Sequence, residues 1–357
     1  FSGNVTVNSS ATGIHRLGVD NALPATAGLT FGSTAGQIDL NGHSQQLAFL
    51  KGSSTGVGGI QNSQAGTKAI LSVIGATSGT FAGLIGTAGK TNIALVKDGS
   101  STLTLSGSSV YAGGTDVKGG TLAAGSASAF GSGNVTLRSG ATLDLGSQAV
   151  GNAIANQGGT VINAVNFAGS QVLSGMSSFA GTVGGSLDVV SGGVLKGDGT
   201  TFTGPVVIES GAVHSPGNSP GLQTFASGLD YRAGSFLRWE LAASTAAAAD
   251  RGTAYDGVNV TGGSLSIAPT SVLDLVFDAS GSTVNWADAF WNVDRSWTII
   301  DTTGATGSTG LFSLGSLSND SLGQTLASIH GGAGFQVIGV GGNVQLNYSV
   351  TAVPEPT

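Results

Sequence analysis

The sequence predicts an all-β protein: a right-handed parallel β-solenoid (β-helix) followed by a smaller β-rich C-terminal domain. Three observations lead to this fold class. Short runs alternate apolar and polar residues between glycine-rich turns, the same short motifs recur along the chain, and long helical patterns are nearly absent. The composition agrees, with 62 glycines in 357 residues, 40% hydrophobic residues and only 9% charged residues. We expect the solenoid to span residues 1–230 and the second domain residues 231–353.

The alternating runs define the strands of the solenoid. Alternation with a period of two places Val, Leu and Ile on one face of a strand and Thr, Asp and Asn on the other. Strands this short cannot bury enough area alone, so we expect them to stack, with glycines at the sharp corners. The clearest runs are Asn4–Val7, Gln37–Leu40, Ser101–Leu105, Asn134–Leu137, Thr142–Leu145, Ser186–Val189 and Pro205–Ile208.

A recurring aromatic–small–glycine motif suggests two related repeat modules. Its aromatic residues are Phe1, Phe81, Tyr111, Phe167, Phe179 and Phe202. The run Phe1–Val7 aligns with Tyr111–Val117, and Leu29–Phe31 then aligns with Val135–Leu137. We therefore interpret residues 1–110 and 111–230 as two copies of one module.

The composition changes near residue 230, where larger side chains begin. All four tryptophans fall in the next 70 or so residues: Trp239, Trp286, Trp291 and Trp297. We expect a conventional core here, one short helix at Asn285–Asn292, and a loop at Leu241–Asp250. The Trp and Tyr side chains of residues 231–297 are either this core or a sugar-binding patch, because aromatic rings also stack on pyranose faces.

Charge and cysteine content exclude several classes of function. The 12 basic residues are scattered in a chain of net charge −7, which gives no electrostatic basis for nucleic-acid binding. The absence of cysteine excludes a disulfide scaffold and Cys-based metal sites. No apolar run reaches 18 residues, so we expect no membrane span in this chain. No signal-peptide pattern is present either, and we expect that an exported protein has lost it by processing.

Catalytic carboxylates are the main candidates for chemistry. A β-helix enzyme that degrades polysaccharide needs acidic residues on adjacent coils. The candidates, each between apolar residues, are Asp39, Asp144, Asp188 and Asp274. They lie too far apart in the sequence for adjacent coils, so we expect outward-facing repeat positions and no enzyme.

The histidines give no metal site. His15, His43, His214 and His330 lack metal-ligand spacing, and we expect surface or turn positions for them. The sequence therefore predicts no catalytic, metal or cofactor-binding residues and no cofactor.

Segments of the chain resemble two known families. Leu95–Gly107 followed by Tyr111–Leu122 resembles the autotransporter-associated β-strand repeat, and Ser210–Gly221 resembles a Pro-Gly-Asn-Ser-Pro-Gly turn found in such proteins. This resemblance implies a passenger-type β-helix on a bacterial surface.

The last residues, Val353–Thr357, resemble the sorting motif of PEP-CTERM exosortase substrates through Pro354, Glu355 and Pro356. The membrane helix and basic tail of that family do not follow here, so residues 354–357 would be a remnant of the motif. The resemblance implies an extracellular destination in a Gram-negative bacterium that forms exopolysaccharide or biofilm.

The function that we expect is that of a structural subunit of an extracellular fibre or matrix. The first coil has an open edge at Phe1, Val5 and Val7, and the run Asn343–Val350 of a neighbouring copy would complete it through Val344, Leu346, Tyr348 and Val350. Repeated head to tail, this contact gives a homopolymer. The alternatives are a surface adhesin or glycan-binding module, with exopolysaccharide as its partner, and a polysaccharide-degrading β-helix enzyme.

Overall fold

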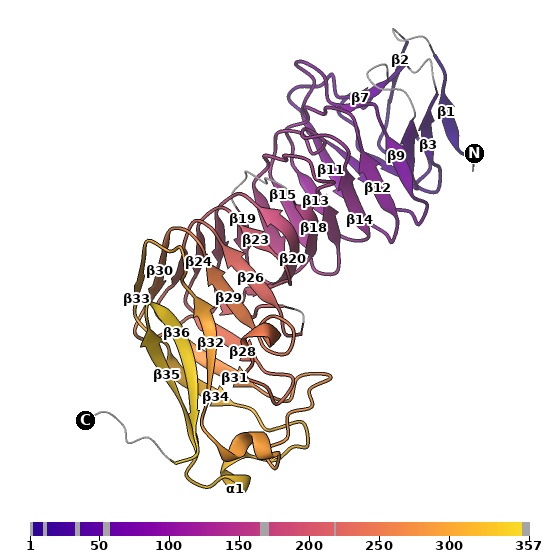
Figure 1. Ribbon diagram of the computed structural model, residues 1–357. Helices are drawn as coiled ribbons and strands as arrows, with labels where there is room; N and C mark the ends of the chain where they lie inside the picture. The colour runs from indigo at the N-terminus through magenta and orange to yellow at the C-terminus, as the bar shows by residue number, and fades with distance from the viewer. Residues whose placement is uncertain are drawn as a thin grey trace. The chain divides into compact units, whose positions relative to one another are not determined.

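The described chain consists almost wholly of short β-strands and turns, as predicted. The computed structural model describes residues 3–9, 13–32, 36–52, 58–164, 171–217 and 219–351. The chain divides into two compact units, residues 1–175 and 176–357. Within each unit, parallel strands from successive coils lie side by side, which confirms a β-solenoid (Figure 1).

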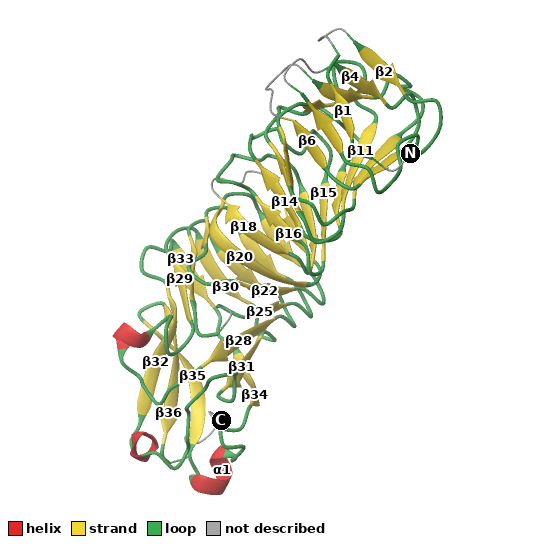
Figure 2. Ribbon diagram, turned by 90° about the vertical axis from the view of Figure 1, so that its right-hand side faces the viewer, coloured by secondary structure: helices red, strands yellow, loops and turns green. Residues whose placement is uncertain are grey.

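Three parallel sheets build the N-terminal unit, which Figure 2 shows from the side. Sheet P contains β1 (Val5–Val7), β3 (Leu29–Phe31), β6 (Leu50–Gly52), β9 (Gly79–Phe81), β12 (Thr102–Leu105), β14 (Thr121–Ala124), β16 (Thr142–Asp144) and β18 (Thr160–Ala164). Sheet Q contains β2 (Ile14–Arg16), β4 (Gln37–Asp39), β7 (Gly59–Gln61) and β10 (Leu84–Ile85). Sheet R contains β5 (Gln45–Leu47), β8 (Ala69–Val73), β11 (Ile93–Lys97), β13 (Thr115–Val117), β15 (Val135–Arg138), β17 (Ile154–Gln157) and β19 (Gln171–Leu173).

The register fixes the length of a coil. Val5 pairs with Leu29 in the first coils, and Leu103 pairs with Leu122 further along. Hydrogen bonds between neighbouring coils join residues 24 apart at Asn4 and 19 apart at Gly107. The coils shorten because sheet Q ends at β10, after which the chain alternates between sheets P and R.

Stacked aliphatic side chains form the core of the N-terminal unit. Leu103, Leu122, Leu143 and Val161 pair in register on successive strands of sheet P, and all four are buried. Burial of one such side chain contributes about 1.5–3 kcal/mol. The polar residues between them face outward, so the period-two pattern in the sequence predicted this core.

Glycine is required at corners where the backbones of successive coils come into close contact. Gly99 has a φ of +74°, and a Cβ there would lie 2.3 Å from the carbonyl oxygen of Ile74 in the coil below. Any side chain would separate the coils at this corner.

The structure does not reproduce the two-copy alignment. Leu29–Phe31 lies in sheet P, whereas the aligned Val135–Leu137 lies in sheet R. Short alternating runs resemble one another on every side of a solenoid, so sequence similarity alone did not identify equivalent positions.

Three sheets also build the C-terminal unit. Sheet X contains the start of β20 (Met176–Val183), then β22 (Val194–Lys196), β25 (Val213–His214), β28 (Phe236–Glu240), β31 (Val272–Val276) and β34 (Ser313–Leu317). Sheet Y contains the end of β20, then β23 (Thr201–Phe202), β26 (Leu222–Phe225), β29 (Gly257–Val260), β32 (Arg295–Asp301), β36 (Asn343–Ser349) and β35 (Gly334–Val340). Sheet Z contains β21 (Leu187–Val189), β24 (Val206–Ile208), β27 (Leu229–Tyr231), β30 (Ser264–Ile267) and β33 (Gly307–Thr309).

Parallel pairing passes the expected domain boundary at residue 230. Asp230 itself pairs with Val207 on one side and with Ser266 on the other. The change in composition near residue 230 is therefore a change in the side chains of the coils, and the coils themselves continue past it.

Aromatic side chains dominate the core of the C-terminal unit. The rings of Phe179, Phe202 and Phe225 follow one another at centroid distances of 5.9 and 5.0 Å. Later in the chain, the four tryptophans are all buried. The ring centroid of Trp291 lies 4.6 Å from that of Trp286 and 6.0 Å from that of Trp297.

The described residues contain three one-turn helices rather than the single one predicted. The predicted segment contains the 3₁₀ helix Ala289–Asn292, whose N-cap Asp288 accepts a hydrogen bond from the Phe290 amide. The others are the 3₁₀ helix Ala248–Asp250, at the end of the predicted loop, and the α-helix α1 (Leu326–Ile329). Segments this short carry no periodicity that a sequence pattern can reveal.

Candidate functional site

The segment that carries the repeat resemblance builds the middle of the N-terminal unit. It runs from the end of β11 through β12 and β13 to β14. Its apolar residues, among them Leu95, Leu105 and Tyr111, are buried. The Tyr111 hydroxyl bonds the Thr115 hydroxyl at 2.6 Å, and burial raises the pKa of Tyr111.

A buried lysine in this segment was missed by the sequence analysis. The Lys97 side chain is fully buried, and its Nζ donates to the carbonyl oxygens of Asp98 (2.8 Å), Gly99 (3.0 Å) and Gly119 (3.1 Å). Burial lowers the pKa of Lys97, while the nearby Asp98 carboxylate opposes that shift. The ammonium ties two successive corners together. The alternating pattern could have predicted this burial, because Lys97 lies two residues after the buried Leu95 and therefore on the same face of the strand.

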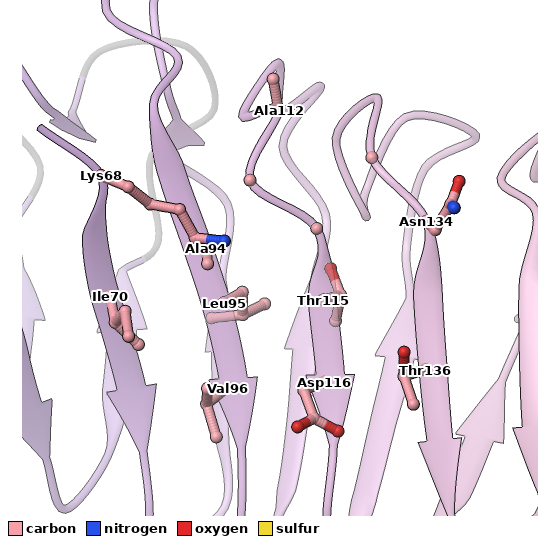
Figure 3. Close-up of a pocket in the computed structure, with 13 residues that line it drawn as sticks. Lys68, Ile70, Ala94, Leu95, Val96, Ala112, Thr115, Asp116, Asn134 and Thr136 are labelled. Carbon is pink, nitrogen blue, oxygen red and sulfur yellow. The ribbon is translucent and has the colours of Figure 1, made fainter. Parts of the chain in front are cut away.

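A groove crosses the outer face of sheet R over β8, β11, β13 and β15 (Figure 3). Its volume is about 540 Å³. Gly113 and Gly114 stand in its lining, and a Cβ on Gly113 would lie 2.5 Å from the carbonyl oxygen of Ile93 in the neighbouring coil. Lys68 lies at one end of the groove and Asn134 at the other.

Polar groups gather along this groove. Asp116 accepts from Arg138 Nε at 2.9 Å and from Arg138 Nη2 at 3.3 Å, and this hydrogen-bonded ion pair raises the pKa of the Arg138 guanidinium. Lys118 Nζ lies 4.0 Å from the same carboxylate. No ion pair involves Lys68 among the described residues. The groove therefore offers hydroxyl, amide, carboxylate and ammonium groups above an apolar floor that includes Ala94 and Val96.

Of the residues predicted for the assembly edge at the start of the chain, Val5 and Val7 lie in β1. β1 pairs with β3 on one side only. Val5 is partly exposed and Val7 is buried. Phe1 lies outside the described residues.

The predicted donor strand is already paired, which overturns its assignment. β36 lies between β32 and β35 and pairs with both in antiparallel orientation. Val344, Leu346 and Tyr348 are buried, and the amide of the exposed Val350 donates to Asp294 at 3.0 Å. This strand has no free edge to offer a neighbouring copy.

The four carboxylates do not form a catalytic set. Their cross-strand partners are other residue types: Asp144 pairs with Ala123 and Ile162, Asp188 with Val207, and Asp274 with Arg238. Asp39 is buried rather than outward-facing. Burial alone would raise its pKa, but hydrogen bonds from Ser63, Asn41 and Arg16 outweigh burial and lower it.

One histidine is in the core, contrary to the prediction of surface or turn positions. His214 is fully buried between Tyr231, whose hydroxyl bonds Nδ1 at 2.6 Å, and Gln223, whose Oε1 bonds Nε2 at 2.7 Å. Burial lowers the pKa of His214 to about 4, although the Gln223 hydrogen bond acts in the opposite direction. His214 is therefore neutral at physiological pH.

The tryptophans are core residues, and the alternative of a Trp-lined sugar patch at 231–297 is wrong. Pro354, Glu355 and Pro356 lie outside the described residues. Within the described ranges, no three His, Asp or Glu side chains come close enough together to hold a metal ion. No helix in those ranges has the length and apolar character needed to cross a membrane.

Comparison with known families identifies one repeat. A family model described as the passenger-associated-transport-repeat matches residues 95–124, the segment that contains Lys97 and part of the groove. No curated protein matches the chain. The chain therefore carries a structural repeat of the kind found in autotransporter passenger domains, which suggests a secreted or surface protein.

Proposed function

We propose that this protein is a structural component of a bacterial cell surface or extracellular matrix that polymerises by joining the ends of its coils. The passenger-associated repeat supports a secreted, structural role. The observation that carries the proposal is the parallel edge of the solenoid at β33, which pairs with β30 only among the described residues. Such edges pair with other strands unless something covers them.

Low charge favours the same role. Only 9% of the residues are charged, so electrostatic repulsion between copies is weak. The described residues offer no catalytic constellation that would favour the enzyme alternative.

Negative-stain electron microscopy and sedimentation velocity of the purified chain test the proposal. We expect filaments or a concentration-dependent series of oligomers. Monomers alone, up to the solubility limit, would refute it.

The groove on sheet R favours a second candidate function, glycan binding. A sugar chain would lie across β8–β15, with Lys68 placed for an acidic sugar. We expect Ala94→Gln, which fills the floor, and Lys68→Ala to weaken retention on acidic polysaccharide by about tenfold, or 1.4 kcal/mol. Val172→Gln, at an exposed position of β19, is the matched control. Equal retention by all four proteins would exclude this groove.

A further inference from the structure

A second groove lies on the outer face of sheet P, in the same unit as the groove on sheet R. Its volume is about 570 Å³, and it crosses β3, β6 and β9. Thr30, Lys51 and Thr80 line it from neighbouring coils, and Thr30 pairs directly with Lys51. We call this hollow groove P and the one over β8–β15 groove R.

Small residues open groove P above a packed core. Gly52, Ala82 and Ser106 belong to its lining. Gly52 pairs with Phe31 on one side and with Phe81 on the other, and the two aromatic rings approach each other to a centroid distance of 5.3 Å. Both rings are buried, and Phe31 forms part of the lining. Groove P therefore has an apolar floor that is supported from inside the coil.

Lys51 brings a positive charge to groove P. Its Nζ lies 4.7 Å from the centroid of the Phe49 ring, a cation–π contact that attracts the ammonium without neutralising it. No ion pair involves Lys51 among the described residues, and none of the described residues that line groove P is acidic. An anionic ligand would therefore meet an uncompensated charge here.

The two grooves present similar chemistry on different sheets. Each contains threonine hydroxyls, an alanine in its floor and one lysine without an ion pair, which is Lys68 in groove R and Lys51 in groove P. Groove R also contains Asp116, whose charge is balanced by Arg138. Outward-facing residues of sheets P and R leave different sides of the coil, so a short ligand in one groove leaves the other accessible.

We propose that groove P is a second binding site for acidic sugar chains, so that one molecule of this protein holds two polysaccharide chains. This inference rests on the glycan binding proposed for groove R. The carboxylate of a uronic acid would pair with the Lys51 ammonium, its hydroxyl groups would bond Thr30 and Thr80, and its ring would cover the apolar floor. A protein with two such sites links polysaccharide chains into a matrix.

Lysine acylation, read by mass spectrometry, tests the inference one groove at a time, with trigalacturonate as the probe. At a ligand concentration of about four times Kd, acylation of a lysine in an occupied groove should fall by about fivefold. We expect this protection at both Lys51 and Lys68. Maltotriose, a neutral sugar of the same length, should protect neither to this extent. Lys196 in β22 of the C-terminal unit is the internal control and should react equally throughout.

Two matched variants show whether the grooves bind independently. Ala82→Gln fills the floor of groove P and Ala94→Gln that of groove R, at positions that are 7% and 9% exposed. We expect Ala82→Gln to abolish the protection of Lys51 only, and Ala94→Gln that of Lys68 only.

Val172→Gln should leave both protections unchanged. Thr80→Gln, at an exposed position of groove P, replaces Ala82→Gln if circular dichroism shows that the latter is misfolded. Protection of Lys68 without protection of Lys51 would overturn the second site and leave glycan binding at groove R intact. Loss of both protections in one folded variant would overturn the independence of the two grooves, and equal protection by maltotriose would overturn the recognition of acidic sugars. Protection of neither lysine refutes glycan binding itself.

Discussion

The two units stabilise similar coils in different ways. The N-terminal unit stacks aliphatic side chains such as Leu103 and Leu122 and ties its corners with backbone contacts and the Lys97 ammonium. The C-terminal unit stacks rings, from Phe179 to the tryptophans, and places His214 in its core. The solenoid fold sets the spacing between strands but does not determine which kinds of side chain fill the core of a coil. The units should therefore respond differently to mutation and to pH.

The largest expected effect is in the tryptophan cluster. Trp291→Ala removes a ring that contacts Trp286 at 4.6 Å and Tyr348 at 5.1 Å, and we expect a loss of about 4 kcal/mol in unfolding free energy. Trp291→Phe is the control and should cost much less, because no described group accepts a hydrogen bond from the indole N–H. Hydrogen exchange should increase in residues 236–349 and remain unchanged in residues 93–145. Equal increases in hydrogen exchange in both regions would show that the tryptophan cluster does not stabilise the C-terminal unit separately from the N-terminal unit.

The second-largest expected effect is a pH dependence of the stability of the C-terminal unit, which contains His214. His214 has a pKa of about 4 in the folded protein and about 6.5 when unfolded, so the unfolded chain takes up the proton more readily. The contribution of neutral His214 to the free energy of unfolding is fully present above pH 6.5. It falls by about 3 kcal/mol as the pH decreases towards 4. Denaturant titrations of wild type and His214→Gln should converge over this interval, since the variant lacks this titration. Parallel pH profiles would contradict the assignment.

Lys97 supplies the corresponding test in the N-terminal unit. Lys97→Met keeps the length of the side chain but removes hydrogen bonds to three carbonyls, and we expect a loss of about 2 kcal/mol. Lys118→Met, an exposed lysine of the same repeat, is the control. Hydrogen exchange should increase at residues 97–121 in the first variant only. An unchanged melting temperature for both would mean that the buried ammonium contributes nothing.

The smallest effect is stabilising. Asp256 is buried, and burial, together with the nearby Glu240 charge, raises its pKa despite amide hydrogen bonds. Burial likewise raises the pKa of the half-buried Glu240. Glu240→Gln removes the like charge, and we expect a gain of about 0.5 kcal/mol at pH 7 after allowance for solvent screening. The gain should fade as the pH falls through the raised pKa values of Asp256 and Glu240, because protonated carboxyl groups do not repel each other. A loss at pH 7 would show that Glu240 is stabilising.

The sequence predicted what depends on local alternation. Strands such as Asn134–Leu137 and Thr142–Leu145 are where the period-two pattern placed them. The pairing of β36 with β32 could not be predicted, because it joins segments nearly 50 residues apart and neither run differs from an ordinary solenoid strand. The groove depends on which coils lie side by side, and so only the register revealed it.

Coil length has a consequence for how such a chain forms and evolves. Most strand pairs join residues about 20 positions apart, so neighbours in space are also near neighbours in sequence. Contacts of this kind form quickly and one after another. Deleting one whole coil, for example the segment between Leu122 and Leu143, would leave the adjoining strands in register, and the number of coils can change without a new fold.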